Sequence, residues 1–412
     1  MQSHKKRSLF AGALLASALL ALSACSGGAA SQPAEPGADD PIRIGLVTSR
    51  SGPYAAYGEE ARTGFNYAFD ELNANGGIDG HPIEVFEGDD LGTAEGAVAA
   101  AQRLVQQNEV DFLVGPIATP VVLALAQRAE DWGVLFIGHS AQGIDLTADS
   151  CTPNFFRANN NDTQIINTVT AWLEQNPDLT DWDAIGADYS LGHDTIAALK
   201  DTIGGDGNSL GQELYAPFGT TDFGAYLSQL DGGDGLLIVN AGNDQVNLLS
   251  QSLEFGTLEN YDAVVTTVAD ATLLDAIGDD RIQGLIGASP WASTIDNADS
   301  RAFTEAFLEA TGKDFVAYNE GSAYIATQTL VAGIEAAQSI DPLEVRDALE
   351  GLTYTTLKGE TTMRAEDHQA LTPVYLGPVA RVDGVLNIVP EFVGLPEAID
   401  PEPSPGCQLP SR

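Results

Sequence analysis

Residues 42–90 decide the fold of this chain and read IRIGLVTSRSGPYAAYGEEARTGFNYAFDELNANGGIDGHPIEVFEGDD. The stretch opens with an apolar, β-rich run at 42–48, which ends at Gly52-Pro53 because these two residues stop regular structure. A segment with helical periodicity follows, and a second β-rich run begins at Ile83. We therefore predict a strand, a helix and a second strand parallel to the first.

The same alternation continues along the chain. Further strands are predicted at 110–114, 134–137, 185–187, 236–240, 263–268 and 285–288. Helices are predicted at 58–75, 93–108, 121–131, 163–176, 194–203 and 243–255, followed by 300–310, 322–337 and 342–352. Two rounds of this pattern meet near residues 155–159. The fold class that we predict is α/β, with two doubly wound lobes of parallel sheet.

The charge of the chain excludes one class of partner. Its 412 residues hold 18 Lys plus Arg and 59 Asp plus Glu, a net charge of −41. A nucleic-acid or anionic-membrane surface needs a basic patch, and this chain has few cations with which to build one. We therefore expect no nucleic-acid partner.

The N-terminus resembles the export signal of a bacterial lipoprotein. A basic start precedes an apolar run at 9–22, too short for the roughly 20 residues that span a bilayer, and small residues lead to Cys25. We expect residues 1–24 to be a signal peptide, Cys25 to carry lipid, and 25–40 to be a flexible tether. The alternative is an ordinary signal peptide. The first interpretation places the protein outside the cytoplasmic membrane, held to it by its lipid alone.

Two cysteines remain beyond the tether, Cys151 and Cys407. An even pair in an oxidising compartment favours a disulfide, which would fix the C-terminal tail, residues 396–412, to the body of the protein. The alternative is two free thiols, because the sequence does not test the distance between them.

Polar loops follow the predicted strands of the first lobe. They lie at 49–58, 115–120 and 138–143 and are rich in Gly, Ser, Thr and Pro. Doubly wound sheets bind ligands at the carboxyl ends of their strands, so these loops form a candidate ligand-binding rim. Taken alone, the loop at 49–58 is better explained as a plain strand-to-helix turn.

An ordered set of motifs connects the chain to a known family. After the SGP turn and Tyr57-Gly58 comes an NxxGGIxG turn at 73–80, and further matches lie at 151–157, 188–194, 221–224, 240–244 and 364–369. Over residues 41–395 the chain resembles the branched-chain amino-acid-binding family, the type I periplasmic binding proteins of ABC importers. Each motif is weak alone, but their order is specific.

The resemblance implies a clamshell of two lobes joined by three crossovers, near Arg157, near Pro290-Trp291 and at 359–362. Lobe 1 would comprise 41–157 and 291–360, and lobe 2 would comprise 158–290 and 361–395. A ligand between the lobes would favour hinge closure, and the closed form would be presented to the transmembrane subunits of an ABC permease. The resemblance implies a monomer that catalyses no reaction and needs no cofactor.

The resemblance also places candidate ligand contacts. Tyr57 would lie against the ligand side chain, and a carboxylate would bind at the helix start around Ala118 and Thr119 and at the loop of Ser140, Ala141 and Gln142. The second lobe would add the residues that cover the ligand and the partner of an amine. These are Tyr189, Asn243, Thr267 and Asp270.

Two departures from the family pattern leave the ligand open. Gln142 stands where amino-acid binders often carry Thr, and Thr267 stands where they carry Glu. A buried ammonium needs a paired anion, so a free amino acid depends on Asp270 reaching the cleft. We expect a branched-chain or related amino acid, or otherwise an amide, a urea-like molecule or an aromatic acid.

Two other functions are alternatives to transport. A ligand sensor of the same fold would pass its closed form to a signalling protein. A serine hydrolase is suggested by Gly138-His139-Ser140-Ala141-Gln142, but the G-x-S-x-G elbow needs Gly where Gln142 stands. The five His are scattered and no metal-binding or phosphate-binding motif is present, so we expect no metal.

Overall fold

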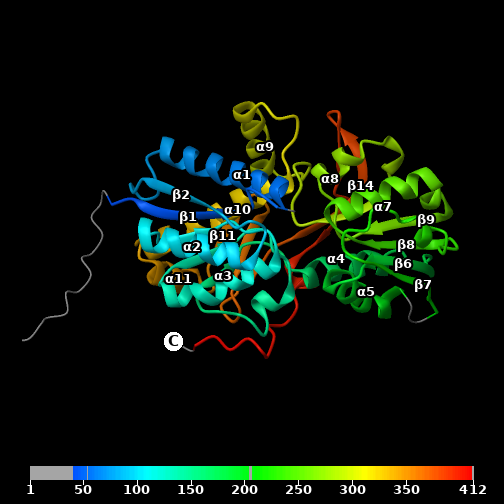
Figure 1. Ribbon diagram of the computed structural model, residues 1–412, viewed down its shortest axis with the longest axis horizontal. Coiled ribbons are helices and arrows are strands. Elements are labelled where there is room, and N and C mark those ends of the chain that lie inside the picture. Colours follow the sequence, from blue (N-terminus) through cyan, green and yellow to red (C-terminus); the bar gives the residue numbers. More distant parts are fainter. Residues whose placement is uncertain (1–39, 53, 204–206, 411–412) are drawn as a thin grey trace, which may run out of the picture. The chain divides into compact units, whose positions relative to one another are not determined.

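The computed structural model describes residues 40–52, 54–203 and 207–410 (Figure 1). The predicted signal peptide, Cys25 and the tether up to residue 39 lie outside the described residues. Within the described part, every helix falls short of the length and hydrophobicity needed to cross a membrane. The two sheets described below belong to one compact unit of the chain.

The first sheet is parallel and has the order β2-β1-β3-β4-β5. Its strands are β1 (Ile42–Thr48), β2 (Ile83–Asp89), β3 (Phe112–Val114), β4 (Leu135–Gly138) and β5 (Phe155–Arg157). The register pairs Ile44 with Val85 on one side and with Phe112 on the other. The strands predicted at 42–48, 110–114 and 134–137 are therefore confirmed as neighbours in one sheet.

Helices cover both faces of this sheet because its strands alternate their apolar side chains between the two faces. Ile44 and Leu46 pack with Phe65 in one buried cluster, whereas Val47 and Leu113 belong to another. The first cluster is covered by α1 (Ala55–Ala74), α10 (Tyr318–Ala337) and α11 (Pro342–Leu349). The second is covered by α2 (Ala94–Asn108) and α3 (Thr119–Trp132).

The turn between α1 and β2 explains the NxxGGIxG motif. The Asn73 side-chain amide donates to the Ile83 carbonyl at 3.0 Å and accepts from the Ile83 N–H at 2.8 Å, so that it acts as a neighbouring strand would. Gly77 has a φ of +83°, and a Cβ there would lie 2.0 Å from the His81 carbonyl oxygen. Only glycine fits this position.

The second sheet is mixed, with the order β15-β14-β10-β9-β8-β6-β7 and β16 beside β14. Strands β6 to β10 are parallel, and β14 joins them antiparallel. The strands are β6 (Asp181–Ala187), β7 (Ser209–Ala216), β8 (Gly233–Val239), β9 (Tyr261–Thr266), β10 (Ile286–Ser289), β14 (Val374–Val382), β15 (Val385–Ile388) and β16 (Phe392–Gly394). Strand β7 was not predicted because exposed and partly buried residues alternate along most of its length, and only its last residue is buried.

Helices again lie on both faces of the second sheet, so the predicted fold class is confirmed (Figure 1). One face packs against α4 (Asp162–Glu174), α5 (Ser190–Ile203) and α12 (Pro396–Ile399). The other packs against α6 (Gly224–Leu227), α7 (Gly242–Phe255) and α8 (Ala271–Ile277). Short 3-10 turns occur at Ile144–Thr147, Thr257–Asn260 and Asp280–Ile282.

The chain passes from the first lobe to the second after β5 and returns after β10 to α9 (Ala298–Thr311). The third crossing differs from the expected position at 359–362. There β12 (Gly359–Met363) pairs with β11 (Thr353–Thr356) and β13 (Ala370–Leu371), and Met363 and Ala370 are buried in the core of the first lobe. The chain therefore crosses at residues 372 and 373, between β13 and β14, because residues 361–371 complete a small sheet of the first lobe.

A disulfide joins Cys151, in the segment between β4 and β5, to Cys407 in the C-terminal tail. The two Cα atoms are 5.5 Å apart, and 256 positions separate the residues in sequence.

Candidate functional site

The loops at the carboxyl ends of the strands of both sheets meet between the lobes. Thr272, in the first turn of α8 in the second lobe, donates a hydrogen bond of 2.7 Å from Oγ1 to Oε1 of Glu60 on α1. Asn319, at the start of α10, donates to the other oxygen of Glu60 at 2.8 Å. Glu60 is only 9% exposed, and burial raises the pKa of its carboxyl despite these two donors. The lobes therefore share a buried carboxylate.

The helix carrying Glu60 approaches the first strand very closely. At Gly58 a Cβ would lie 2.0 Å from the carbonyl oxygen of Ser49, so a side chain at this position would force the helix away. The close approach places Tyr57 in the first turn of α1, beside the end of β1. The Tyr-Gly pair of the sequence motif thus positions both the aromatic ring and Glu60.

Asp270 faces the same region from the second lobe. Its carboxylate caps α8 by accepting from the Leu273 N–H at 2.9 Å. Burial raises its pKa to about 6, and the charge of Glu60 contributes. The pKa of the Tyr57 hydroxyl is also raised, chiefly by burial and further by the charges of Asp270 and Glu60. Tyr57, Glu60 and Asp270 therefore lie within electrostatic reach of one another across the two lobes.

The loop after β4 is held by the start of α10. Ser140 donates to Oδ1 of Asn319 at 2.9 Å, and the Gln142 side-chain amide donates to the Tyr318 hydroxyl at 3.3 Å. Asn159 donates to the same hydroxyl at 2.5 Å. Ser140 and Gln142 are thus brought to the region between the lobes, and Tyr318 acts as a common acceptor there.

A buried arginine fixes the shape of this loop. The Arg157 guanidinium donates to the Gly143 carbonyl at 2.7 Å, to the Ala141 carbonyl at 3.3 Å and to the Thr147 hydroxyl. Burial lowers its pKa to about 10, and the nearby charges of Asp162 and Asp367 oppose this shift. At neutral pH the side chain is a cation with loop carbonyls as acceptors.

Ala141 and Thr119 both help to hold the loop after β4 in place. The Ala141 methyl is buried in the cluster beneath α2 and α3, so this residue can offer a ligand only its backbone. Thr119 Oγ1 accepts from the Gly143 N–H at 3.2 Å, which ties the helix start to the loop after β4. Ala118 precedes it as the N-cap of α3.

The second lobe contributes a partly exposed aromatic residue. Tyr189 lies just after β6, with its ring edge-on to Phe218 at a centroid distance of 6.1 Å. Burial raises its pKa to about 12, and Tyr54 of the first lobe adds to the shift. The Asn243 side chain is exposed to solvent at the start of α7, and its neighbour Asp244 accepts from the Gly219 N–H at 2.8 Å.

Two buried polar groups end neighbouring strands of the second sheet. Thr267 directly follows β9 and is 5% exposed, and Asn240 directly follows β8 and is 1% exposed. The Thr267 hydroxyl and the Asn240 amide nitrogen have no hydrogen-bond partner among the described residues. Buried polar groups are normally paired, so these two are available to a ligand or a water molecule.

The hydrolase alternative fails on geometry. Ser140 donates to an amide oxygen, and the neighbouring His139 ring lies edge-on to Phe65 at a centroid distance of 5.2 Å. Burial lowers the pKa of His139 to about 3. The ring is fully buried, and neither of its nitrogens has a partner among the described residues. Ser140 therefore lacks the activating base that nucleophilic catalysis needs.

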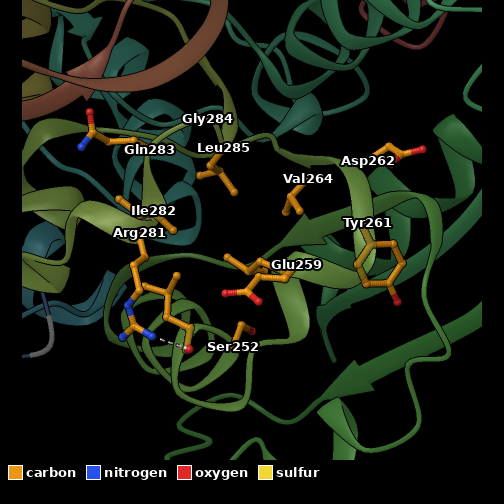
Figure 2. Close-up of a pocket in the computed structure, with 13 residues that line it drawn as sticks. Ser252, Glu259, Tyr261, Asp262, Val264, Arg281, Ile282, Gln283, Gly284 and Leu285 are labelled. Carbon is orange, nitrogen blue, oxygen red and sulfur yellow. Dashed lines mark hydrogen bonds between the residues drawn. The ribbon is translucent and has the colours of Figure 1, made fainter.

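No group of three or more His, Cys, Asp or Glu in the described ranges is arranged to hold a metal ion. Two cavities among the described residues lie away from the meeting loops. One of about 220 Å³ is lined by Tyr261 and Leu285, near the amino ends of β9 and β10, with the Arg281 guanidinium bonded to the Leu253 carbonyl at its wall (Figure 2). Another, of about 280 Å³, lies between α1 and α10.

Sequence reasoning missed Glu60, Tyr318 and Asn319. Glu60 could have been predicted from the sequence, because it lies one helical turn from Tyr57 and residues at this spacing share a helix face. Nothing in the sequence indicates that Tyr318 and Asn319 belong to the site, since only tertiary packing brings α10 to the loop after β4.

Two α/β lobes joined by three crossovers, with polar loops meeting between them, define a solute-binding protein. A model of the periplasmic binding protein family matches residues 41–384, and the chain belongs to this family.

Its similarity to individual proteins extends over most of its length. The Leu/Ile/Val-binding protein BraC3 of Rhizobium johnstonii is 28% identical over 338 residues, covering 78% of this chain and 87% of the relative. The amino acid ABC transporter substrate-binding protein of Pseudomonas fluorescens Pf-5 has a TM-score of 0.80 at 23% identity, covering 90% of this chain and 99% of that one. A solute-binding protein of Rhodopseudomonas palustris HaA2, solved with p-hydroxybenzoic acid, has a TM-score of 0.76 at 23% identity and coverages of 89% and 98%. All three relatives are named as binding proteins, and the two solved structures are named as binding proteins of ABC transporters.

Proposed function

We propose that this chain is the extracytoplasmic receptor of an ABC importer, which captures a small polar ligand between its lobes and delivers it to the permease. The hydrogen bond between Thr272 and Glu60 carries the proposal, because it joins the ligand-side loops of the two lobes. A ligand that contacts both lobes shifts the equilibrium toward closure by its extra affinity for the closed state.

The ligand that the site favours is a branched-chain or related amino acid. Asp270 supplies the anion for an ammonium group, since its carboxylate is buried near Glu60 and accepts from the backbone N–H of Leu273. The Tyr57 ring packs against the ligand side chain. The carboxylate binds at the start of α3 and the loop after β4, through Ala118, Thr119, Ser140, Ala141 and Gln142.

The remaining contacts come from the second lobe. Tyr189 and Asn243 cover the ligand, and the unpartnered Thr267 hydroxyl offers a hydrogen bond. Aromatic acids, amides and urea-like molecules are the other ligand classes, and an aromatic acid is the ligand named for the Rhodopseudomonas palustris relative.

A thermal-shift panel tests the ligand class. The protein is unfolded and refolded to remove carried ligand and is then heated with leucine, valine, other amino acids, hydroxybenzoates, short amides and urea. We expect one chemical class to raise the melting temperature, with every compound recovered unchanged. Conversion of a compound into product would instead favour an enzyme.

The lipid anchor is a separate part of the proposal. The Cys25 thiol receives a diacylglyceryl group, Cys25 becomes the new N-terminus when the signal peptide is removed, and the lipid holds the protein to the outer face of the membrane. The Cys25→Ser variant tests this assignment, with Cys407→Ser as the matched control for loss of a cysteine. We expect only Cys25→Ser to release the protein from the membrane fraction, and a wild-type protein without lipid would contradict the anchor.

A further inference from the structure

The C-terminal segment begins in the core of the second lobe. Helix α12 packs on α4, with Ile399 fully buried in the cluster of that lobe. The Asn167 amide donates to the Ile399 carbonyl at 2.7 Å, and the Gln164 amide donates to the Asp400 carboxylate at 2.6 Å. The chain is therefore anchored to the second lobe up to Asp400.

The next residues are attached to the first lobe. Arg364, between β12 and β13, donates to the Pro401 carbonyl at 2.5 Å, and the Ser404 hydroxyl donates to Asp149 at 3.3 Å. Cys407 then forms its disulfide with Cys151, in the segment between β4 and β5. Figure 1 shows this segment in red, running from the region of α4 toward the first lobe. We call residues 400–407 the C-terminal strap.

The composition of the strap makes it stiff. It reads DPEPSPGC, with proline at 401, 403 and 405. Proline fixes its own φ near −65° and restricts the residue before it to extended conformations, so proline-rich segments act as semi-rigid spacers. A turn at the far end, in which the Cys407 N–H donates to the Ser404 carbonyl at 3.0 Å, brings the cysteine to its partner. The strap therefore has little slack.

The strap also lies close to the hinge. The first and third crossovers run side by side there, since the Asn160 amide donates to the Thr372 carbonyl at 2.8 Å. The Gln164 side chain that holds Asp400 also donates to the Ala370 carbonyl at 3.1 Å, just before the third crossover. The residues that anchor the strap are thus shared with the segments that must bend when the lobes separate.

We propose that the C-terminal strap is a fourth covalent connection between the lobes, closed by the disulfide, which limits how far the lobes separate at the hinge. A tail fixed only to one lobe would not have this effect. Only the expected effect on ligand binding rests on the proposed function. With a limited opening the closed state stays populated, so less of the ligand's binding energy is needed to close the lobes. The restraint itself needs no ligand.

The test cuts the strap after the protein has folded. A protease site inserted between Pro403 and Ser404 of the full-length chain allows the strap to be cleaved while the disulfide stays intact. Amide hydrogen exchange is then followed by mass spectrometry in the absence of ligand. After the strap is cleaved, we expect several-fold faster exchange of the backbone amides in the crossovers at 158–161 and 372–374 and of those around Glu60 and Thr272. The reason is that the lobes then separate more freely.

Two control chains distinguish a restraint on the separation of the lobes from local stabilisation of the C-terminal tail. The uncleaved insertion chain reports the effect of the insertion alone, and a variant with Pro401, Pro403 and Pro405 replaced by Gly keeps a continuous but slack strap. The slack variant should exchange faster at the crossovers, as the cleaved chain does. Changes confined to residues 395–410 in both chains would overturn the proposal and leave the disulfide a local staple. Neither result depends on finding the ligand, so a failure here is distinct from a failure of the proposed function.

Discussion

Thr272 and Glu60 lie on different lobes and share a hydrogen bond of 2.7 Å. The bond exists only when the first turn of α8 meets the first turns of α1, so it requires the two lobes to lie together at this point. The second oxygen of Glu60 accepts from Asn319 within the first lobe, which keeps the carboxylate in place for its partner. Glu60 is therefore an acceptor fixed in the first lobe for a donor from the second lobe.

Replacing Thr272 with Val should weaken ligand binding. The substitution keeps the shape of the side chain but removes the donor, and the loss of one such hydrogen bond costs about 0.5–1.5 kcal/mol. Calorimetric titration with the compound identified by the thermal-shift panel measures the effect. Thr272→Ser keeps a hydroxyl and should retain most of the affinity. Equal affinities of the Val variant and wild type would show that the bond does not contribute to closure.

Replacing Tyr57 with Ala should also weaken binding, by about 1 kcal/mol or more, through lost burial and ring contact. The melting temperature of the ligand-free protein should change little, because Tyr57 is incompletely buried. Tyr57→Phe is the matched control, since it keeps the ring and removes the hydroxyl. An unchanged affinity in Tyr57→Ala would remove this residue from the binding site.

Asp270 should make stability depend on pH. Its pKa is about 6 in the folded protein against an ordinary value of 3.8, so between these values the folded state binds more protons than the unfolded state. Asp270 therefore favours folding at low pH, and this contribution is lost as the pH rises through about 6. Asp270→Asn keeps a helix-capping side chain and should remove the contribution.

Melting temperatures of wild type and Asp270→Asn, measured without ligand from pH 4 to 8, test this expectation. The variant should gain stability relative to wild type as the pH rises. Glu60, whose pKa is also raised, titrates in both proteins, and because its charge raises the pKa of Asp270, the difference also contains the interaction between these two carboxyls. A constant difference across the range would mean that Asp270 titrates normally.

The disulfide should be present in the exported protein and should stabilise it. Mass spectrometry of peptides prepared without reduction should find Cys151 joined to Cys407, and free thiols at both positions would contradict the structure. Cys407→Ser should lower the free energy of unfolding by about 2–5 kcal/mol, since the bond closes a long loop of 256 positions.

Local patterns in the sequence were sufficient for most of the parallel strands, namely β1 to β4, β6 and β8 to β10, and for most of the helices beside them. The run at 42–48 became β1 with the predicted bounds, because apolar residues fill both faces of a buried strand. Strand β7 and the small sheet of β11, β12 and β13 were not predicted, since their partly exposed residues carry a weaker apolar pattern. The third crossing was predicted too early in the chain because β12 and β13 were not predicted. It is the pairing of β12 with β13 that places this segment in the first lobe.

The candidate site, like the fold, could be predicted from the sequence only in part. The loops at 49–58 and 138–143, with Tyr57 and Ser140, were predicted because each follows a strand end, whereas Asp270 was placed by the resemblance to the family. Asn319 was missed because it is separated by 259 positions from Glu60, the residue it contacts, and a single sequence contains no sign of that contact. Arg157 was predicted as a crossover, but its role as the donor that shapes the loop after β4 depends on three oxygens brought together by folding.

The most direct test of the receptor function is calorimetric titration of the refolded, ligand-free protein with leucine, valine, other amino acids, hydroxybenzoates, amides and urea. We predict saturable binding of one chemical class with a stoichiometry of about one, as expected for a single site between two lobes, and no conversion of the bound compound. Absence of binding by all of these compounds, or turnover of any of them, would contradict the proposal that this chain is a receptor for a small polar solute of these classes.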